Sequence, residues 1–189
     1  MSSMIHITEA EKSQARVIAR LIMMAMTDEC CLHFCAEGYG LESFLKMMVL
    51  LVEREDSQYS YRNTYVAVDG DKVIGIAVSY GDIQARLPAS QDIVHQPVFL
   101  HPCQNGLCRY IRVPTLGMDG EVQAVANRRQ GIARRLVLAT KEKADKMGLP
   151  LGLLVDKGNS SGAAFYDSIG FRVSNESHWG GHEMKHLIL

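Results

Sequence analysis

The chain has 189 residues, of which 47% are hydrophobic and 22% charged, as one globular domain needs to bury a core and remain in solution. Its 20 basic and 21 acidic residues give a net charge of −1, so there is no general reason to bind nucleic acid or an anionic membrane. The first residues lack the basic start and apolar run of a signal peptide. No apolar stretch reaches the roughly 18 residues of a membrane span. We therefore expect a cytoplasmic protein without a membrane or nucleic-acid partner.

Five cysteines, an odd number, argue against a disulfide framework in a cytosolic chain. A zinc site would have to join Cys103 and Cys108 to the cysteines within Cys30–Cys35, with or without His33, and no pair has the close CxxC spacing of a zinc knuckle. Free cysteine is commonly buried as a small apolar side chain. We expect buried thiols and no metal.

The N-terminal residues predict one strand and two helices. Apolar and polar residues alternate over residues 4–8, as in a half-buried strand. Ser13 is a suitable cap for a helix whose apolar residues recur at helical spacing as far as about Met26. After a glycine-containing loop, a second helix is predicted where an apolar stripe extends from Leu41 to Val52.

A hairpin follows these helices. Residues 56–63 are polar and aromatic, which indicates a loop, and residues 64–68 are β-branched and apolar, which indicates a strand. The turn signal Asp69-Gly70-Asp71 joins this strand to a second one over residues 72–80. The second strand is apolar almost throughout, so we expect it to be covered on both faces.

Residues 81–119 are the least regular part of the sequence. Four of the five prolines lie here, and proline fixes φ and removes a backbone donor. We therefore expect a long loop without a long helix or a central strand. Both flanks of the loop are needed for one sheet, so we expect a single domain over residues 1–189.

Six elements are predicted after the loop, with strands and helices alternating. In chain order they are strand Glu121–Val125, a helix from after Gly131 to about Met147, strand Leu151–Val155, helix Gly162–Ile169 opened by Ser160 or Ser161, and strands Phe171–Ser174 and Glu183–Leu189. The alternation predicts a mixed α/β fold. The strand–helix–strand unit over residues 121–155 should form a right-handed parallel crossover.

The most informative segment is Arg128-Arg129-Gln130-Gly131-Ile132-Ala133, between a predicted strand and a predicted helix. The unpaired N–H groups and the dipole of a helix N-terminus attract anions, Gly131 and the small Ala133 allow close approach, and Arg134 and Arg135 add positive charge. An ordinary glycine turn with solvated arginines explains these residues equally well. The segment lacks the Gly-Lys-Ser/Thr of a Walker A loop and the three glycines of a dinucleotide fingerprint.

A second motif lies downstream and consists of Asn159, then Ala163-Ala164, then Phe165-Tyr166, then Gly170-Phe171. The two motifs together resemble the GNAT superfamily of N-acyltransferases. Members of that superfamily carry Arg/Gln-x-x-Gly-x-Gly/Ala at a helix start and, further along, an asparagine, an alanine, an aromatic–tyrosine pair and Gly-Phe. The likeness is strongest over residues 121–172 and extends to the whole chain through the order of elements.

The resemblance implies the GNAT fold, with a central mixed, mostly antiparallel sheet of roughly seven strands flanked by helices. This sheet would splay between the strands at 121–125 and 151–155. Acetyl-CoA is the implied cosubstrate: its pyrophosphate would lie on the arginine-rich turn, and its pantetheine arm would lie along the splayed strand and beside Asn159. The implied cofactor-binding residues are Gln123, Ala124, Val125, Arg128, Arg129, Gln130, Gly131, Ile132, Ala133, Arg134, Asn159 and Phe165.

The same resemblance implies direct transfer of the acetyl group in a ternary complex. Tyr166 matches the tyrosine that donates a proton to the leaving thiolate, and Glu121, or Asp119 near it, matches the carboxylate that deprotonates the amine. The backbone amide near Val125 would polarise the thioester carbonyl. The structural alternatives are a core tyrosine packed on Phe171 and a solvent-facing carboxylate at a strand's start.

Acidic and aromatic residues in the first two helices and the loops suit a cationic amine acceptor, although a charged surface with loop tyrosines is an equal explanation. These residues are Asp28, Glu29, Glu37, Tyr39, Glu53, Glu55, Asp56, Tyr59, Tyr61 and Asp82. The acceptor is expected to be a small molecule or a peptide, and the resemblance also allows a homodimer.

Two other functions remain open from the sequence. Members of the superfamily commonly have a proline and two further residues between the strand and the first arginine, whereas only Ala126 and Asn127 separate Val125 from Arg128 here. This departure favours a GNAT-fold module that binds acyl-CoA without turnover. A nucleotide-binding α/β protein is the third possibility, and it lacks the accompanying lysine or glycines.

Overall fold

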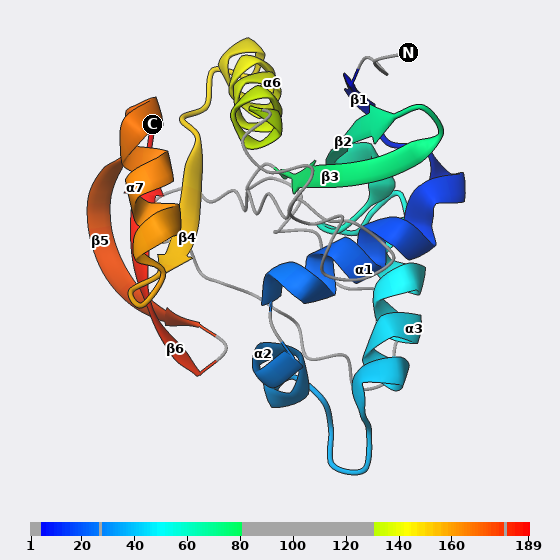
Figure 1. The fold of residues 1–189 in the computed structure, drawn as a ribbon. Coiled ribbons are helices and arrows are strands. Elements are labelled where there is room, and N and C mark those ends of the chain that lie inside the picture. Colours follow the sequence, from blue (N-terminus) through cyan, green and yellow to red (C-terminus); the bar gives the residue numbers. More distant parts are fainter. Residues whose placement is uncertain (1–4, 27, 81–130, 180) are drawn as a thin grey trace.

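The computed structural model describes residues 5–26, 28–80, 131–179 and 181–189. Its elements are β1 (His6–Glu9), the 3-10 helix η1 (Lys12–Gln14), α1 (Ala15–Met26), α2 (Asp28–His33), α3 (Leu41–Glu53), the 3-10 helix η2 (Tyr61–Asn63), β2 (Thr64–Asp69), β3 (Lys72–Val78), α6 (Ile132–Lys146), β4 (Gly152–Asp156), α7 (Ser160–Ile169), β5 (Arg172–Trp179) and β6 (His182–Ile188). The described strands form two antiparallel sheets, ordered β1-β2-β3 and β4-β6-β5 (Figure 1). The mixed α/β class is as predicted.

The sheet β1-β2-β3 is covered on both faces, which explains why β3 is apolar almost throughout. Ile76 packs into the core formed with α1 and α3, whereas Ile74, two residues earlier, packs into the core formed with α6. Side chains two apart in a regular strand share a face. The register shift between Ala67 and Val68 of β2 interrupts that alternation, because a bulge moves the following side chains to the other face.

The second core joins α6 to the sheet β4-β6-β5. Leu136 and Val137 of α6 are fully buried and pack in one cluster with Leu153 of β4, Leu187 of β6 and Phe171. Burying each such side chain stabilises the fold by roughly 1.5–3 kcal/mol. This packing fixes α6 between the two sheets (Figure 1).

The end of the β5–β6 hairpin reaches the N-terminal helices. The ring of Trp179, the last residue of β5, lies 5.2 Å from the ring of Phe34, centroid to centroid. A side chain at Gly181 in the hairpin turn would meet His33 of α2, whose Nδ1 lies 3.6 Å from the ideal Cβ position. Residues from the N-terminal helices and from the C-terminal hairpin are therefore neighbours in the fold.

Most of the predicted elements are confirmed within one to three residues, and three local predictions are wrong. Ser13 does not cap the first helix, because it lies inside η1, where its hydroxyl donates to the carboxylate of Glu11. α2 stands where the sequence predicts loop. α7 is opened by Asn159, whose side-chain oxygen accepts from the N–H of Gly162, and the predicted serine caps are wrong.

The loop at 81–119, the strand at 121–125 and the parallel crossover lie outside the described residues. The splay between that strand and β4 and the count of roughly seven strands therefore stay predictions. What the described residues add is the pairing of the C-terminal strands: β6 lies between β4 and β5, so the last strand of the chain is the central one of its sheet.

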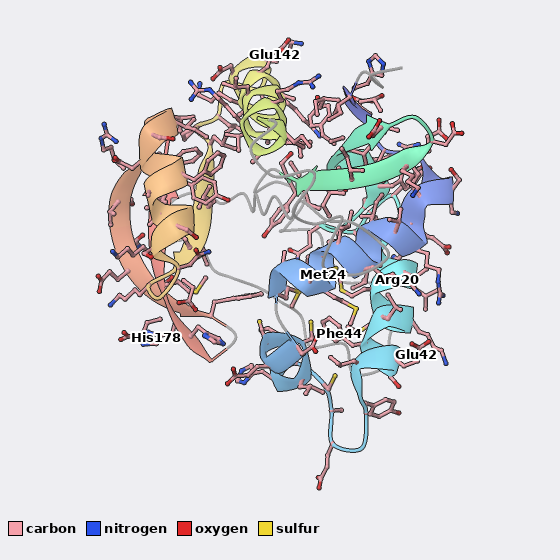
Figure 2. The ribbon with its side chains drawn as sticks, in the orientation of Figure 1. Arg20, Met24, Glu42, Phe44, Glu142 and His178 are labelled. Carbon is pink, nitrogen blue, oxygen red and sulfur yellow. The ribbon has the colours of Figure 1, made fainter. Side chains whose placement is uncertain are left out.

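Charged side chains such as those of Arg20, Glu42 and Glu142 point away from the body of the molecule (Figure 2). No helix in the described part of the chain is long and apolar enough to cross a membrane. Cys30 and Cys31 are buried thiols, as predicted. In that same part of the chain, no three histidine, cysteine, aspartate or glutamate side chains gather as a metal site would require, and Cys103 and Cys108 lie outside it.

Candidate functional site

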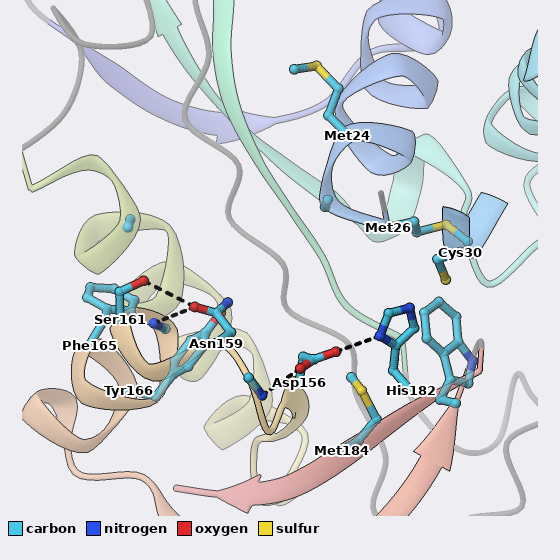
Figure 3. Close-up of a pocket in the computed structure, with 15 residues that line it drawn as sticks. Met24, Met26, Cys30, Asp156, Asn159, Ser161, Phe165, Tyr166, His182 and Met184 are labelled. Atoms are coloured by element: carbon cyan, nitrogen blue, oxygen red, sulfur yellow. Dashed lines mark hydrogen bonds and ion pairs between the residues drawn. The ribbon is translucent and has the colours of Figure 1, made fainter. Parts of the chain in front are cut away.

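A cavity of about 630 Å³ lies between α1, α2, the first turn of α6, α7 and the ends of β4, β5 and β6 (Figure 3). This volume is in the range of roughly 300–1,000 Å³ typical of small-molecule and cofactor sites. The described residues that line it are Met24, Ala25, Met26, Cys30, Ala133, Asp156, Gly158, Asn159, Ser161, Gly162, Phe165, Tyr166, Trp179, His182 and Met184. Four of them, Ala133, Asn159, Phe165 and Tyr166, are residues that the sequence motifs assign to a cofactor site.

The first turn of α6 has the features of an anion site. Gly131 is its N-cap with φ +70°, a left-handed conformation that costs a residue with a side chain roughly 1–2 kcal/mol. No heavy atom of the described residues lies within 4 Å of the position of a Cβ on Gly131, so the glycine is required by its backbone conformation. The first turn contains no acidic residue that would oppose an anion at the positive end of the helix dipole.

The other residues of this turn divide between core and solvent. The side chain of Ile132 is 1% exposed and belongs to the core, so only its backbone can face a ligand. Arg134 is exposed, and within the described residues it makes no ion pair. Arg135 is directed elsewhere, because its Nη2 donates to the carbonyl of Ile5 at 2.9 Å and ties α6 to the residue before β1.

Asn159 positions the start of α7 at the edge of the cavity. Its Oδ1 accepts the backbone N–H of Gly162 at 2.9 Å and the hydroxyl of Ser161 at 3.1 Å. The amide oxygen is thus used within the protein, and the amide nitrogen is the part of Asn159 that can donate to a ligand. A helix cap of this kind also satisfies one of the unpaired N–H groups of the first turn.

Tyr166 is both a core residue and a cavity residue. Only 8% of it is exposed, and its ring makes edge contacts with Phe165 and Phe171, at centroid distances of 5.1 and 5.4 Å. The alternative of a core tyrosine packed on Phe171 is therefore correct as far as packing goes. It does not exclude the chemical role, because Tyr166 lines the cavity as well.

A pair that sequence reasoning missed lies in the middle of the cavity wall. Nδ1 of His182, at the start of β6, is 3.0 Å from Oδ2 of Asp156, at the end of β4 (Figure 3). Oδ1 of the same carboxylate accepts the N–H of Gly158 at 2.6 Å, which fixes its orientation. About a third of each side chain is exposed, so the pair faces the cavity without being buried in the core.

No family model and no curated protein matches the sequence, whereas solved structures match nearly the whole chain. An N-acetyltransferase from Staphylococcus aureus Mu50 is 18% identical, with a TM-score of 0.74 over 97% of this chain and 100% of that one. An acetyltransferase of the GNAT family from Streptococcus pneumoniae is 16% identical, with a TM-score of 0.54 over 98% of each chain. PaiA N-acetyltransferase from Thermoplasma acidophilum, in complex with coenzyme A, is 15% identical, with a TM-score of 0.52 over 97% and 98% of the two chains. The chain has the GNAT fold.

Several of the residues that the GNAT motifs assign lie outside the described part of the chain. They are Asp119, Glu121, Gln123, Ala124, Val125, Arg128, Arg129 and Gln130. The carboxylate base, the splayed strand and half of the phosphate turn therefore stay predictions. The described half of the turn, from Gly131 to Arg134, begins a helix as the motif requires.

One wall of the cavity is formed by apolar side chains. α1 and α2 contribute Met24, Met26 and Cys30, and the β5–β6 hairpin contributes Trp179 and Met184. Figure 3 shows Met26 and Cys30 on the far side of the Asp156–His182 pair from Asn159 and Tyr166, and Met184 next to the pair. Of the two helices that the sequence assigns to an acceptor site, α1 lines this cavity, whereas α3 contributes no residue to its described lining.

The described acidic and aromatic residues that were predicted to attract an amine do not line this cavity, and Asp82 lies outside the described residues. Among the described ones, Glu55 pairs with Arg62 at 2.8 Å and Asp56 with Arg54 at 2.7 Å, both at the surface. Hydrogen bonding to Arg54 lowers the pKa of Asp56. Tyr59 lines a separate small apolar cavity of about 40 Å³. The charged-surface explanation is correct for these carboxylates.

Proposed function

We propose that this protein is an N-acetyltransferase, which moves the acetyl group of acetyl-CoA to a primary amine by direct transfer in a ternary complex. The observation that carries the proposal is that Ala133, Asn159, Phe165 and Tyr166, which come from two separate sequence motifs, line one cavity. The likeness in fold to acetyltransferases, some solved with coenzyme A, supports it.

The cofactor part of the proposal rests on the start of α6. Its backbone N–H groups and dipole would hold the pyrophosphate, with Arg134 adding positive charge from the exposed side. The pantetheine arm would then pass Ala133, whose small side chain leaves room, and reach the amide nitrogen of Asn159. The thioester would arrive beside Tyr166, which lines the same cavity.

The chemistry needs a neutral amine, a polarised carbonyl and a proton for the leaving thiolate. The amine nitrogen attacks the thioester carbon, a C–N bond forms and the C–S bond breaks. Tyr166 is proposed as the proton donor to sulfur, because a phenol stays protonated at neutral pH. Its ring is held by Phe165 and Phe171, so the hydroxyl keeps one position.

The acceptor is proposed to be a small-molecule or peptide amine that reaches the thioester from the side of the apolar wall. Met24, Met26, Cys30 and Trp179 would contact the part of the acceptor that carries the amine. Methionine side chains adapt to varied apolar shapes, and an aromatic ring attracts a cation. A cytoplasmic location and a homodimer are further parts of the proposal.

Two measurements on the purified protein test the function. Titration calorimetry should show uptake of coenzyme A, and acetyl-CoA at about one hundred times its Kd should add roughly 2.7 kcal/mol to the free energy of unfolding. Thiol release should then require both acetyl-CoA and a member of a mixed amine library. Binding without any release would point to an acyl-CoA sensor, and no binding at all would remove both functions.

A further inference from the structure

Asp156 and His182 are brought together by the register of the C-terminal sheet. Asp156 pairs with Met184 across β4 and β6, so His182 lies two residues further along β6 and diagonal to Asp156. Diagonal positions on one face of a sheet are within reach of long side chains. The result is the 3.0 Å contact between Nδ1 of His182 and Oδ2 of Asp156.

We propose that His182, oriented by Asp156, is the base that takes the proton from the acceptor amine. The inference rests on the proposed acetyl transfer and deepens it, because it assigns to a histidine the step that the sequence motif gives to Glu121. Three observations carry it: Asp156 and His182 line the cavity that Tyr166 also lines, the N–H of Gly158 holds the carboxylate of Asp156, and that carboxylate contacts Nδ1 of His182 and not Nε2.

The contact with Asp156 decides which nitrogen can act. A carboxylate beside Nδ1 favours the tautomer that carries its proton on Nδ1, which leaves the lone pair of a neutral imidazole on Nε2. Within the described residues, Nε2 of His182 makes no hydrogen bond or ion pair. The N–H of Gly158, which donates to Oδ1 of Asp156 at 2.6 Å, keeps the carboxylate from turning away.

The position of the pair suits transfer between a thioester and an amine. In Figure 3 the pair lies between Asn159 and Tyr166 on one side and Met26 and Cys30 on the other. A thioester beside Tyr166 and an acceptor against the apolar wall would meet in front of Nε2. A base must lie within hydrogen-bond reach of the proton that it removes, directly or through one water.

The ionisable groups around His182 come from three elements besides its own. They are Asp156 at the end of β4, with Lys157 following it, Cys30 and His33 on α2, and Tyr166 on α7; Glu183 follows His182 on β6. Lys157 and Glu183 are 3.6 Å apart, and Lys157 also pairs with Glu176, so these charges are partly compensated. Among these groups, and within the described residues, only Asp156 lies within ion-pair distance of His182.

The step balances without a further reactant. Nε2 takes one proton from the ammonium form of the acceptor, and the neutral nitrogen attacks the thioester carbon. The C–S bond then breaks, and the leaving sulfur takes the hydroxyl proton of Tyr166. The nitrogen that has attacked loses a second proton, and this proton returns to the Tyr166 oxygen. His182 returns its proton to solvent, so one proton is released for each amide and each free thiol formed.

The test measures kcat/KM for one amine across pH in full-length wild type, His182→Gln, Asp156→Asn and Glu121→Gln. In the wild type, kcat/KM should rise over roughly pH 5–8, where imidazole side chains change charge. In His182→Gln, kcat/KM should fall by about 10²-fold or more near neutral pH and should no longer rise over this pH range. Part of the rate should return at high pH, where more of the amine is neutral. Asp156→Asn, which keeps an acceptor for Gly158, should lose activity in the same way, while the Kd for coenzyme A stays unchanged in both.

His178→Gln is the matched control. His178 is an exposed histidine of β5 whose Nε2 lies 3.7 Å from a carboxylate oxygen of Glu183, and it does not line the cavity. This variant should keep the wild-type profile. If His182→Gln and Asp156→Asn also keep the wild-type pH profile of kcat/KM, the inference is overturned. It is also overturned if only Glu121→Gln loses the rise of kcat/KM with pH. In both cases the proposed acetyltransferase activity is unaffected. Wild-type protein that binds coenzyme A and releases no thiol would instead overturn the proposed function, and this inference with it.

Discussion

Asn159 and Gly162 fit together as a pair at the start of α7. Oδ1 of Asn159 accepts the N–H of Gly162 at 2.9 Å, and a Cβ on Gly162 would lie only 2.7 Å from Nδ2 of the asparagine. The cap therefore depends on a side-chain oxygen at position 159 and on the absence of a side chain at position 162. Because α7 carries Phe165 and Tyr166, this pair also sets where those rings enter the cavity.

Asn159→Ala should lower stability, because alanine cannot accept the N–H of Gly162. The loss of such a cap costs about 1 kcal/mol, which lowers Tm by roughly 2–4 °C in a domain of this size. Thermal unfolding followed by circular dichroism measures it. Asn159→Asp is the control: it keeps the cap oxygen and should keep the Tm, but it lacks the amide donor and should bind coenzyme A more weakly. Equal coenzyme A affinity in Asn159→Asp and wild type would remove Asn159 from the cofactor site.

Gly131→Ala and Gly148→Ala form a matched pair at the two ends of α6. Gly131 has φ +70° and Gly148 φ +63°, and in the described part of the chain neither has an atom within 4 Å of an added Cβ. Each variant should lose about 1–2 kcal/mol of unfolding free energy from backbone strain alone. Only Gly131→Ala should also weaken coenzyme A binding in calorimetry, since it disturbs the proposed anion site. Equal affinity in the two variants would place the pyrophosphate elsewhere.

Tyr166→Phe should lower kcat by about 10²-fold with little change in the Kd for acetyl-CoA, because it removes the proton donor and keeps the ring. The edge contacts with Phe165 and Phe171 need only the ring, so the fold should survive. Tyr65→Phe removes a hydroxyl from another tyrosine packed on the same core, away from the described cavity lining, and should leave kcat unchanged. Undiminished activity of Tyr166→Phe across pH would show that another group protonates the thiolate.

Lys157→Gln should make the free energy of unfolding change less as pH falls into the acid range. Nζ of Lys157 lies 2.8 Å from Oε2 of Glu176, and this hydrogen bond, together with the charge of Lys157, lowers the pKa of Glu176. A lowered carboxyl pKa gives stability that is present above the ordinary glutamate value and is lost as pH falls through the lowered one.

The same hydrogen bond raises the pKa of Lys157, so at alkaline pH its contribution is lost as pH rises through that raised value. Urea midpoints of wild type and Lys157→Gln should therefore differ at neutral pH and converge in acid. The difference should be small, because the pair lies at the surface. Glu176→Gln should reproduce it. A difference of the same size in acid and at neutral pH would mean that Lys157 acts through packing.

Local patterns in the sequence were sufficient for the longer elements. The helical spacing of Ile132, Leu136 and Val137 predicts α6, and the Asp69-Gly70-Asp71 turn predicts the hairpin of β2 and β3, because periodicity and turn chemistry are properties of neighbouring residues. The sequence also contains enough information to predict the cap of α7. Asparagine is among the best N-cap residues, but the two serines that follow Asn159 are equally suitable by type, and they were predicted instead.

The six-residue α2 shows the limit of such patterns. Asp28–His33 is too short for a helical period to be recognised, and isolated helices of that length are not stable in water. The helix exists because Cys30 and Cys31 pack into the core with α1 and α3. Tertiary contacts supply the free energy that local propensity lacks.

Sequence patterns predict the longer elements, the glycine that begins α6 and the motif that carries Asn159, Phe165 and Tyr166. The contact between His182 and Asp156, and the cavity that they share with Met24, Cys30 and Trp179, are known only from the folded chain. Strand register and the packing of helices on sheets bring these residues together from distant parts of the sequence. No local sequence pattern specifies such long-range contacts.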